Sequence, residues 1–482
     1  CVALLACLHL SLAQAEAPFR FADSSVNADP SDWMGLSEDQ VFFRMLTHRE
    51  EGNSWTIKIG KGGQFYSIKT PELGELIAPQ RAEHGQWVDE VFQHVIPMPP
   101  QKSATNIVVD GDIHQAGYYI WSDLDHKVQV IPRSVYSPLF AYRHDPAGDS
   151  VSYITWPQHA HLPRRYSENQ ALIAQTIKDL GGGVIEIGVE ISKWGGARFE
   201  QFNLPFSAFR TRTLPVQVLG NRDGSYRVVS KEFRSNENVP KLREAGTGGW
   251  IALVSADSPS ARGIGIVYGK DPREIDEKAG VVRWGSYAPG RPEVGGTVAT
   301  VRRNVSLDAG ESLYYRYYLV LGTLAEIQAK GNALESRVVL EKVKRKPEDT
   351  PLMPICADAG NGLKRTCEAG QGPVFNAYRE FVPGSRPLFL LEKAGAGEYL
   401  ITDNPYEISF DPTDGATKYL DLLGWVLPQD RTADACRYQP LANAVAAAKP
   451  RPRVGQNASE LRVVSATADK CPPPGANPGG AR

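Results

Sequence analysis

The sequence is poor in histidine, and its last two-thirds contain none. All nine His lie at or before position 161 in a chain of 482 residues. A reaction that needs an imidazole as acid or base must therefore use the first third of the chain. The sequence also has no GxSxG, HExxH, P-loop or dinucleotide-binding motif. This argues against the hydrolases, metalloproteases and nucleotide enzymes that carry those motifs.

Neither an excess of one charge nor a long apolar segment is present. The 53 Lys and Arg residues nearly balance the 55 Asp and Glu residues, for a net charge of −2. No basic stripe of the kind that binds nucleic acid is visible. Beyond the N-terminus, no run approaches the roughly 18–20 apolar residues that a membrane-spanning helix needs. The sequence thus predicts no nucleic-acid partner and no membrane span.

Cysteine is scarce, and the first one begins a segment that indicates export from the cell. An apolar run from Cys1 ends at Ala13-Gln-Ala15, which looks like the core and cleavage site of a secretory signal. We therefore expect residues 1–15 to be a signal peptide, truncated because it starts with Cys, and the protein to be secreted, extracellular or periplasmic.

Four further cysteines are expected to form two disulfides. Proximity favours the first pairing with the second and the third with the fourth, although three connectivities are open. These residues are Cys356, Cys367, Cys436 and Cys471.

Short alternating apolar segments dominate the first 345 residues. Examples are Trp55–Ile59, Val184–Ile191 and Tyr314–Leu321, separated by turns rich in glycine and proline. One helix is predicted from Leu324 to Glu335, and a second, shorter one between Pro163 and Asp179. So many strands with so few helices predict an all-β fold: a large antiparallel β-sandwich with a small C-terminal β module.

The charged, proline-punctuated segment from Lys342 to Pro351 indicates a domain boundary. We expect residues 16–345 to form the catalytic sandwich and residues 346–430 a small disulfide-containing β module. Residues 431–482 are rich in Pro and Ala and are expected to be a tail that is partly tethered by Cys471.

The fourteen residues from Tyr153 to Tyr166 hold two His, two Tyr, two Arg and a Trp. His159 and His161 are two apart, so on a strand both imidazoles point to one face. This is also the pattern of a polar strand end whose His and Arg only cap turns. A metal site is a further reading, with His84, His94 or His114 as a third ligand, although no cofactor is expected.

A second cluster, Gln86–His94, contains Trp87, Asp89, Glu90 and Gln93. Indole rings stack on sugar faces, while carboxylates and amides bind sugar hydroxyls. The alternative is a partly buried strand with solvated acids.

A third cluster places Asn203 before Arg210 and Arg212 across a turn. Arg suits bidentate capture of a carboxylate, such as that of a uronic acid. The alternative is that Arg210 and Arg212 lie on an exposed strand edge and have no binding role.

These clusters suggest β-elimination on a uronate-containing polysaccharide. Arg210, or an amide of Gln93 or Asn203, would neutralise the carboxylate and acidify the neighbouring C–H. His161 is the expected base and Tyr166 the acid. Trp87, Asp89, Glu90, Gln93, His159, Asn203 and Arg212 are the expected substrate-binding residues.

Two other functions remain open. Hydrolysis of a glycosidic bond would need two carboxylates at a defined spacing, and the candidates are Asp89, Glu90, Glu186, Glu190 and Glu200. In a non-catalytic glycan-binding protein, the same clusters would be binding subsites only.

The strand pair around Gly62–Ile68, the Trp87–Gln93 segment and the Tyr-rich strand near 314 resemble the β-supersandwich carbohydrate enzymes. That group is similar in fold to galactose mutarotase and includes polysaccharide lyases and hydrolases. The resemblance covers about residues 40–345 and names no family within the group. It implies that His, Tyr and Arg or Asn side chains perform the chemistry, here His161, Tyr166, Arg210 and Asn203. The α/α toroid of the long lyases is missing, which puts their substrate groove in doubt.

Overall fold

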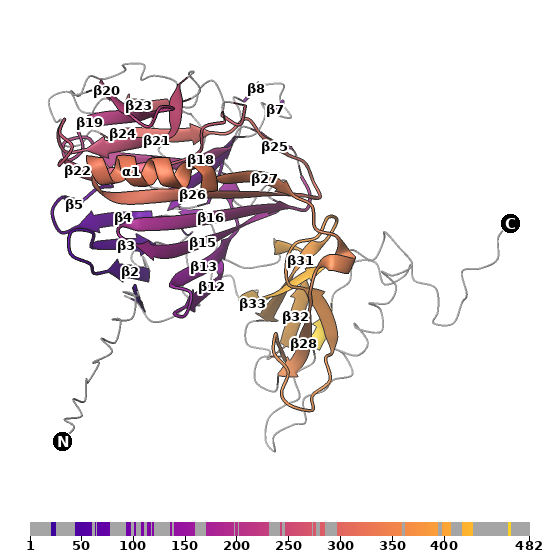
Figure 1. The fold of residues 1–482 in the computed structure, drawn as a ribbon. Helices are drawn as coiled ribbons and strands as arrows, with labels where there is room; N and C mark the ends of the chain where they lie inside the picture. The colour runs from indigo at the N-terminus through magenta and orange to yellow at the C-terminus, as the bar shows by residue number, and fades with distance from the viewer. Residues whose placement is uncertain are drawn as a thin grey trace, which may run out of the picture.

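The computed structural model describes residues 21–25, 44–59, 63, 65–77, 93–97, 101–102, 108–109, 113–116, 118–119, 135–136, 139–159, 170–196, 198–200, 202–230, 242, 246–271, 273–275, 280–284, 296–358, 362–393, 398–405, 417–427 and 461–463. Nearly all the regular structure in these ranges is β-strand, with one α-helix across a face of the largest sheet (Figure 1). The all-β fold class is confirmed. In these ranges no helix has both the length and the apolar character for crossing a bilayer.

The largest sheet has ten strands, and its pairings are antiparallel. In spatial order the strands are β12 (Leu139–Asp145), β13 (Ser150–Thr155), β15 (Ala171–Gly181), β16 (Val184–Lys193), β26 (Glu311–Thr323), β22 (Arg262–Val267), β21 (Thr247–Val254), β19 (Val216–Asn221) and β20 (Tyr226–Ser230), with β27 (Val339–Val343) also paired to β26.

Strand β15 occupies most of the segment where a second helix was predicted, so that prediction is wrong for residues 171–179. Burial alternates along it: Ile173, Gln175 and Ile177 are buried, whereas Thr176 and Lys178 are exposed. Its two edges pair with β13 and β16. β-branched side chains suit this pleated surface, and pairing on both sides outweighs any local helical pattern.

The turn from β15 to β16 needs glycine. Gly181, Gly182 and Gly183 have φ angles of 74°, 59° and 74°, in the left-handed region that other residues rarely adopt. A Cβ on Gly183 would also lie 2.2 Å from the carbonyl oxygen of Leu321. The glycine run in the sequence therefore sets both the turn and the close approach of β26.

Two smaller sheets pack on the large one. The five-stranded sheet contains β1 (Ala22–Ser25), β2 (Arg44–His48), β3 (Trp55–Ile59), β4 (Phe65–Thr70) and β5 (Gly74–Glu75). The six-stranded sheet runs β14 (Gln158–His159), β9 (Ile113–Ala116), β6 (Gln93–Pro97), β18 (Asn203–Arg210), β24 (Gly296–Arg302) and β23 (Gly280–Trp284). Three short pairs are β7 (Gln101–Lys102) with β8 (Val108–Val109), β10 (Tyr118–Tyr119) with β11 (Val135–Tyr136), and β17 (Phe199–Glu200) with β25 (Ser306–Leu307).

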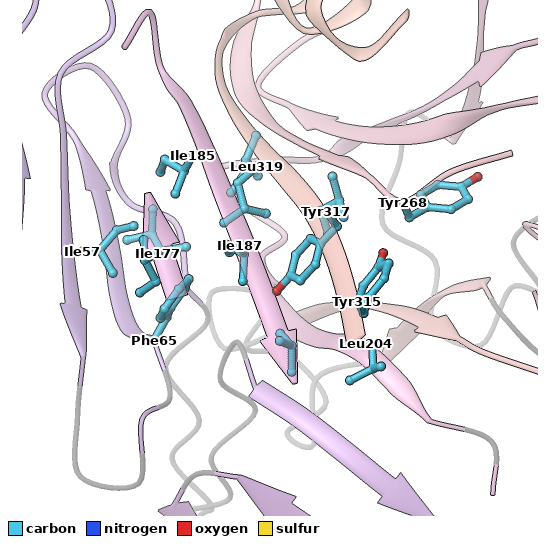
Figure 2. Close-up of a cluster of buried hydrophobic side chains, with 14 of the residues drawn as sticks. Ile57, Phe65, Ile177, Ile185, Ile187, Leu204, Tyr268, Tyr315, Tyr317 and Leu319 are labelled. Carbon is cyan, nitrogen blue, oxygen red and sulfur yellow. The ribbon is translucent and has the colours of Figure 1, made fainter. Parts of the chain in front are cut away.

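One hydrophobic core joins these three sheets. It includes Ile57 from the five-stranded sheet, Leu204 from the six-stranded sheet and Ile187 from the ten-stranded sheet, all completely buried. Figure 2 shows these side chains with Tyr315 and Tyr317 of β26 among them. Burial of this apolar surface is the main stabilising contribution to the fold.

The α-helix α1 (Leu324–Leu334) covers the other face of the ten-stranded sheet (Figure 1). It begins with a capping box in which Thr323 and Glu326 satisfy each other's backbone N–H groups. Leu324 and Ile327 pack with Trp250, whose indole N–H donates to Asn332 at 2.9 Å. The helix predicted at 324–335 is confirmed.

The seven-stranded sheet forms entirely from later residues. It runs β29 (Gly362–Lys364), β28 (Leu352–Asp358), β30 (Phe375–Tyr378), β33 (Thr417–Val426), β31 (Arg386–Lys393), β32 (Glu398–Thr402) and β34 (Leu461–Val463). Between β27 and β28 lie the 3₁₀ turn η6 (Pro347–Asp349) and the predicted boundary; another 3₁₀ turn, η5 (Glu335–Arg337), follows α1.

Cys356 and Cys367 form a disulfide in this sheet, as the sequence predicts. Cys436 and Cys471 lie outside the described residues. Strand β34, which lies within the segment predicted to be a tail, pairs in parallel with β32.

Candidate functional site

The six-stranded sheet carries three of the residues that the sequence selected. Gln93 begins β6, His159 ends β14 and Asn203 begins β18. In the sheet order β14-β9-β6-β18, their strands are neighbours or near neighbours. The sequence separates Gln93 from Asn203 by more than 100 residues, and the fold brings them into one sheet.

The strand register places these residues at one end of β18. Asn203 pairs with Val95 of β6, and Gln93 pairs with Phe206. His159 pairs with His114 of β9, which pairs in turn with Ile96. With strands about 4.8 Å apart, β14 and β18 are separated by about 14 Å. Paired residues share a face of a sheet, so Asn203 and Gln93 lie on the face of Val95, whereas His159 and His114 lie on the opposite face with Ile96.

Arg210 lies at the opposite end of β18, about 20 Å along the strand from Asn203. Its backbone N–H donates to Leu76 at 2.8 Å, and its Nε donates to the carbonyl oxygen of Ile77 at 3.0 Å. The peptide of Ile77 is itself fixed, because its N–H donates to the Glu75 carboxylate at 3.1 Å. The half-buried guanidinium is thus anchored to the chain segment after β5.

Arg212 lies in the turn after β18 and is exposed. Among the described residues, neither Arg210 nor Arg212 has an ion pair with an acidic side chain. The structure therefore brings Asn203 and Gln93 to one face, places His159 on the opposite face, and leaves the two arginines at the other end of β18.

Arg302 is a residue that the sequence reasoning missed. It is the register partner of Asn203 on β24, so a basic residue and an amide lie side by side on neighbouring strands. The only signal in the sequence is the Arg302-Arg303 pair at the end of an alternating segment. The sequence of this segment alone does not show that its strand pairs with the strand of Asn203.

Arg303, the next residue, is completely buried at the same end of the sheet. Its backbone N–H donates to Phe202 at 2.6 Å, and its Nη2 donates to the carbonyl oxygen of Tyr268 at 2.7 Å. The guanidinium also lies 4.3 Å from the ring centre of Tyr315 and donates to its hydroxyl. Its Nε and Nη1 have no hydrogen-bond partner among the described residues.

Burial shifts the pKa of two groups near Arg303. Burial raises the pKa of Tyr315 to about 12, although the charge of Arg303 opposes this shift. Burial also raises the pKa of the half-buried Glu274, and Arg303 again opposes the shift. The phenol stays neutral at ordinary pH, and Arg303 supplies a buried positive charge at this end of β18.

Of the glutamates considered for hydrolysis, Glu190 is held in an ion pair, and Glu186 and Glu190 lie too far apart to act as a catalytic pair. Glu186 and Glu190 lie on the outer face of β16, with Cα atoms about 13 Å apart. Glu190 accepts from Arg345 Nη2 at 2.7 Å and from Ser312 at 2.9 Å. The ion pair with Glu190 and a second one with Glu380 outweigh burial and raise the pKa of Arg345. Glu200 is in β17.

The remaining predicted residues lie outside the described part of the chain. They are His161, Tyr166, Trp87, Asp89 and Glu90, together with His84 of the metal reading. Within the described part, no group of three or more His, Cys, Asp or Glu residues could hold a metal ion.

No family model matches the chain, and no curated protein matches it. One similar solved structure is the 4-alpha-glucanotransferase from Thermococcus litoralis, with 9% identity, a TM-score of 0.29, and coverage of 63% of this chain and 40% of that chain. Another, a protein from Klebsiella pneumoniae named as an aldose 1-epimerase, has 9% identity, a TM-score of 0.31, and coverage of 66% and 92%. A galactose mutarotase-like protein from Clostridium acetobutylicum has 7% identity, a TM-score of 0.32, and coverage of 63% and 98%.

Galactose mutarotase-like proteins are thus among the structural neighbours, as the resemblance found in the sequence implies.

Proposed function

We propose that this protein is a secreted carbohydrate-active enzyme that cleaves a uronate-containing polysaccharide by β-elimination. The observation that carries the proposal is the distribution of groups along β18. An anchored guanidinium stands at one end, and two amides and an arginine, at Gln93, Asn203 and Arg302, share a face at the other. A polymer lying along this strand would meet both ends, whereas a single small sugar would meet only one.

Arg210 suits an anionic binding subsite. Its Nε–H is fixed on the Ile77 carbonyl, so the orientation of the guanidinium is set before substrate arrives. A pre-oriented guanidinium binds a carboxylate with less loss of side-chain entropy than a mobile one does. Arg212 adds positive charge two residues later. We assign Arg210 to a uronate one or more units away from the bond that breaks.

The reaction itself belongs at the other end of β18. Asn203, Gln93 or Arg302 would bind the carboxylate of the reacting uronate and so acidify its C5–H. His161 would remove that proton. The electron pair then forms the C4–C5 double bond, and the glycosidic oxygen leaves with a proton from Tyr166. The buried charge of Arg303 would favour the enolate-like anion that develops.

Secretion is part of the same proposal. A disulfide between Cys356 and Cys367 suits an oxidising compartment, and polysaccharides of this kind lie outside the cell. The apolar N-terminal segment supplies the expected export signal.

The test is a screen of the purified protein against acidic and neutral polysaccharides. Each reaction is followed both by ultraviolet absorbance of an unsaturated product and by release of reducing ends. Elimination gives both signals together on acidic polymers. Reducing ends without absorbance would replace the proposal with hydrolysis, and binding without either signal would replace it with a glycan-binding role.

A further inference from the structure

A buried imidazole links the five-stranded sheet to the ten-stranded sheet. His48, the last residue of β2, has no exposed side-chain surface. Its Nδ1 lies 2.5 Å from Oδ2 of Asp179, near the end of β15, and Asp179 is also almost completely buried. Its Nε2 lies 3.2 Å from Oε2 of Glu50, in the turn after β2. The ring stacks on Trp55 of β3, with centroids 5.7 Å apart.

This geometry selects the charged form of the ring. A neutral imidazole carries one N–H and one lone pair, so one ring nitrogen would face a carboxylate oxygen without a proton between them. The imidazolium has two N–H groups and can donate to both carboxylates. Between two carboxylates, a buried histidine is therefore stable as a cation.

The two carboxylates are fixed by the glycine turn of the large sheet. Glu50 Oε2 accepts from the backbone N–H of Gly182 at 2.7 Å, and Asp179 Oδ1 accepts from that of Gly181 at 2.9 Å. The backbone N–H of Asp179 donates to Asp149 at 2.9 Å. The imidazolium thus completes a bridge from the β2–β3 turn to the β15–β16 turn.

We propose that protonated His48 is a pH-sensitive latch that holds the five-stranded sheet on the β15–β16 turn, and that loss of the proton releases it. The latch does not depend on the proposed enzymatic function. Each element packed around it contributes a charged or titratable group. These are Arg44 on β2, Glu50 in the β2–β3 turn, His144 on β12, Asp149 in the β12–β13 turn, Asp179 on β15 and Lys330 on α1, which donates to the Gly182 carbonyl.

Of these groups, only the carboxylates of Glu50 and Asp179 contact the imidazole ring. Burial alone lowers the pKa of His48, but the hydrogen bonds and charges of Asp179 and Glu50 outweigh it and raise the pKa above 6.5. A raised pKa in the folded state means that the latch contributes fully below about pH 6.5. The contribution is lost as the pH rises through the raised value.

The first experiment measures unfolding by denaturant between about pH 5 and 9 for the wild type and for His48→Gln. Each unit by which the pKa is raised changes the unfolding equilibrium constant by about tenfold across this window. The wild type is expected to lose that stability as the pH rises, and His48→Gln to lack this component. Parallel curves would overturn the latch.

Arg262→Gln is the matched control. Arg262 donates to the carbonyl oxygen of Gly52 in the same β2–β3 turn, and its charge does not change in this range. Its loss is expected to lower stability equally at every pH.

A measurement on the unaltered histidine covers the case in which His48→Gln does not fold. Trp55 fluorescence, taken as the difference between the wild type and Trp55→Phe, reports the charge on the stacked ring. This fluorescence difference is expected to change with pH, with a midpoint above pH 6.5. A midpoint at or below 6.5, or no titration, would refute the latch.

Discussion

The indole of Trp425 stands edge-on to that of Trp194, with ring centroids 6.0 Å apart and planes inclined by 68°. Trp194 follows β16 of the large sheet, and Trp425 lies in β33 of the seven-stranded sheet. Phe140, Trp156 and Leu172 bury their side chains in the same cluster as residues of β31 and β33. The C-terminal sheet is therefore packed on the sandwich through an aromatic contact and is more than a tethered appendage.

We expect Trp425→Ala to loosen this contact. Truncation of a buried indole typically costs about 3–5 kcal/mol. Denaturant unfolding should show the loss, and limited proteolysis should cut faster near residues 343–351. Tyr419→Phe is the conservative control, because it removes only the hydroxyl that donates to the Phe140 carbonyl. Its expected cost is about 1 kcal/mol. Unchanged stability in Trp425→Ala would show that the contact contributes little.

Arg210→Lys tests the anionic subsite. A lysine keeps the charge but cannot both hold the Ile77 carbonyl through Nε–H and present a planar fork to a carboxylate. We expect KM for acidic polysaccharides to rise about tenfold, with neutral polymers and kcat little changed. Arg212→Lys, at the exposed position, serves as the control and should have a smaller effect. Equal losses on acidic and neutral substrates would count against uronate binding.

His161→Ala tests the base. Loss of one general base typically lowers the rate by about 10²–10⁴, and we expect this loss in kcat with the unfolding transition unaltered. His126→Ala, at an imidazole with no assigned role, should retain full activity. Wild-type turnover in His161→Ala would exclude His161 from the mechanism.

The buried phenols should make the protein sensitive to alkali. Burial raises the pKa of Tyr315 to about 12, so its folded form stays neutral where the unfolded form ionises. Its stabilising contribution is complete below about pH 10 and is lost as the pH rises through 12. The phenolate absorbance of Tyr315, taken as the difference between the wild type and Tyr315→Phe, should therefore appear together with the loss of circular dichroism. A difference signal that appears before unfolding would contradict this. Tyr315→Phe should also remove up to about 3 kcal/mol of the stability change between about pH 10 and 12.

Local sequence pattern predicted much of the fold. Alternation of apolar residues located strands such as β3 and β16, because period-two burial is a property of each segment alone. The helix after Thr323 was predicted for the same reason. Cys356 and Cys367, eleven residues apart, were close enough for proximity to favour their pairing.

Properties that depend on distant segments were not predicted. The pairing of Asn203 with Arg302, and the burial of Arg303 against Tyr315, follow from strand order, which no single segment contains. The strand β15 was partly taken for a helix because its own residues do not reveal the two neighbours that pair with it. The buried ion pair of His48 was not predicted because one of its carboxylate partners, Asp179, lies on a strand more than 100 residues away.

The carbonyl oxygen of Ile77 comes after the last strand of the five-stranded sheet, yet it holds a guanidinium that belongs to another sheet. Recombinant versions that start after this residue would lose the carbonyl that orients Arg210, together with the five-stranded sheet, which contributes to the shared core. Weak retention of acidic glycans by such shortened proteins would then reflect both losses and would give no information about the catalytic residues.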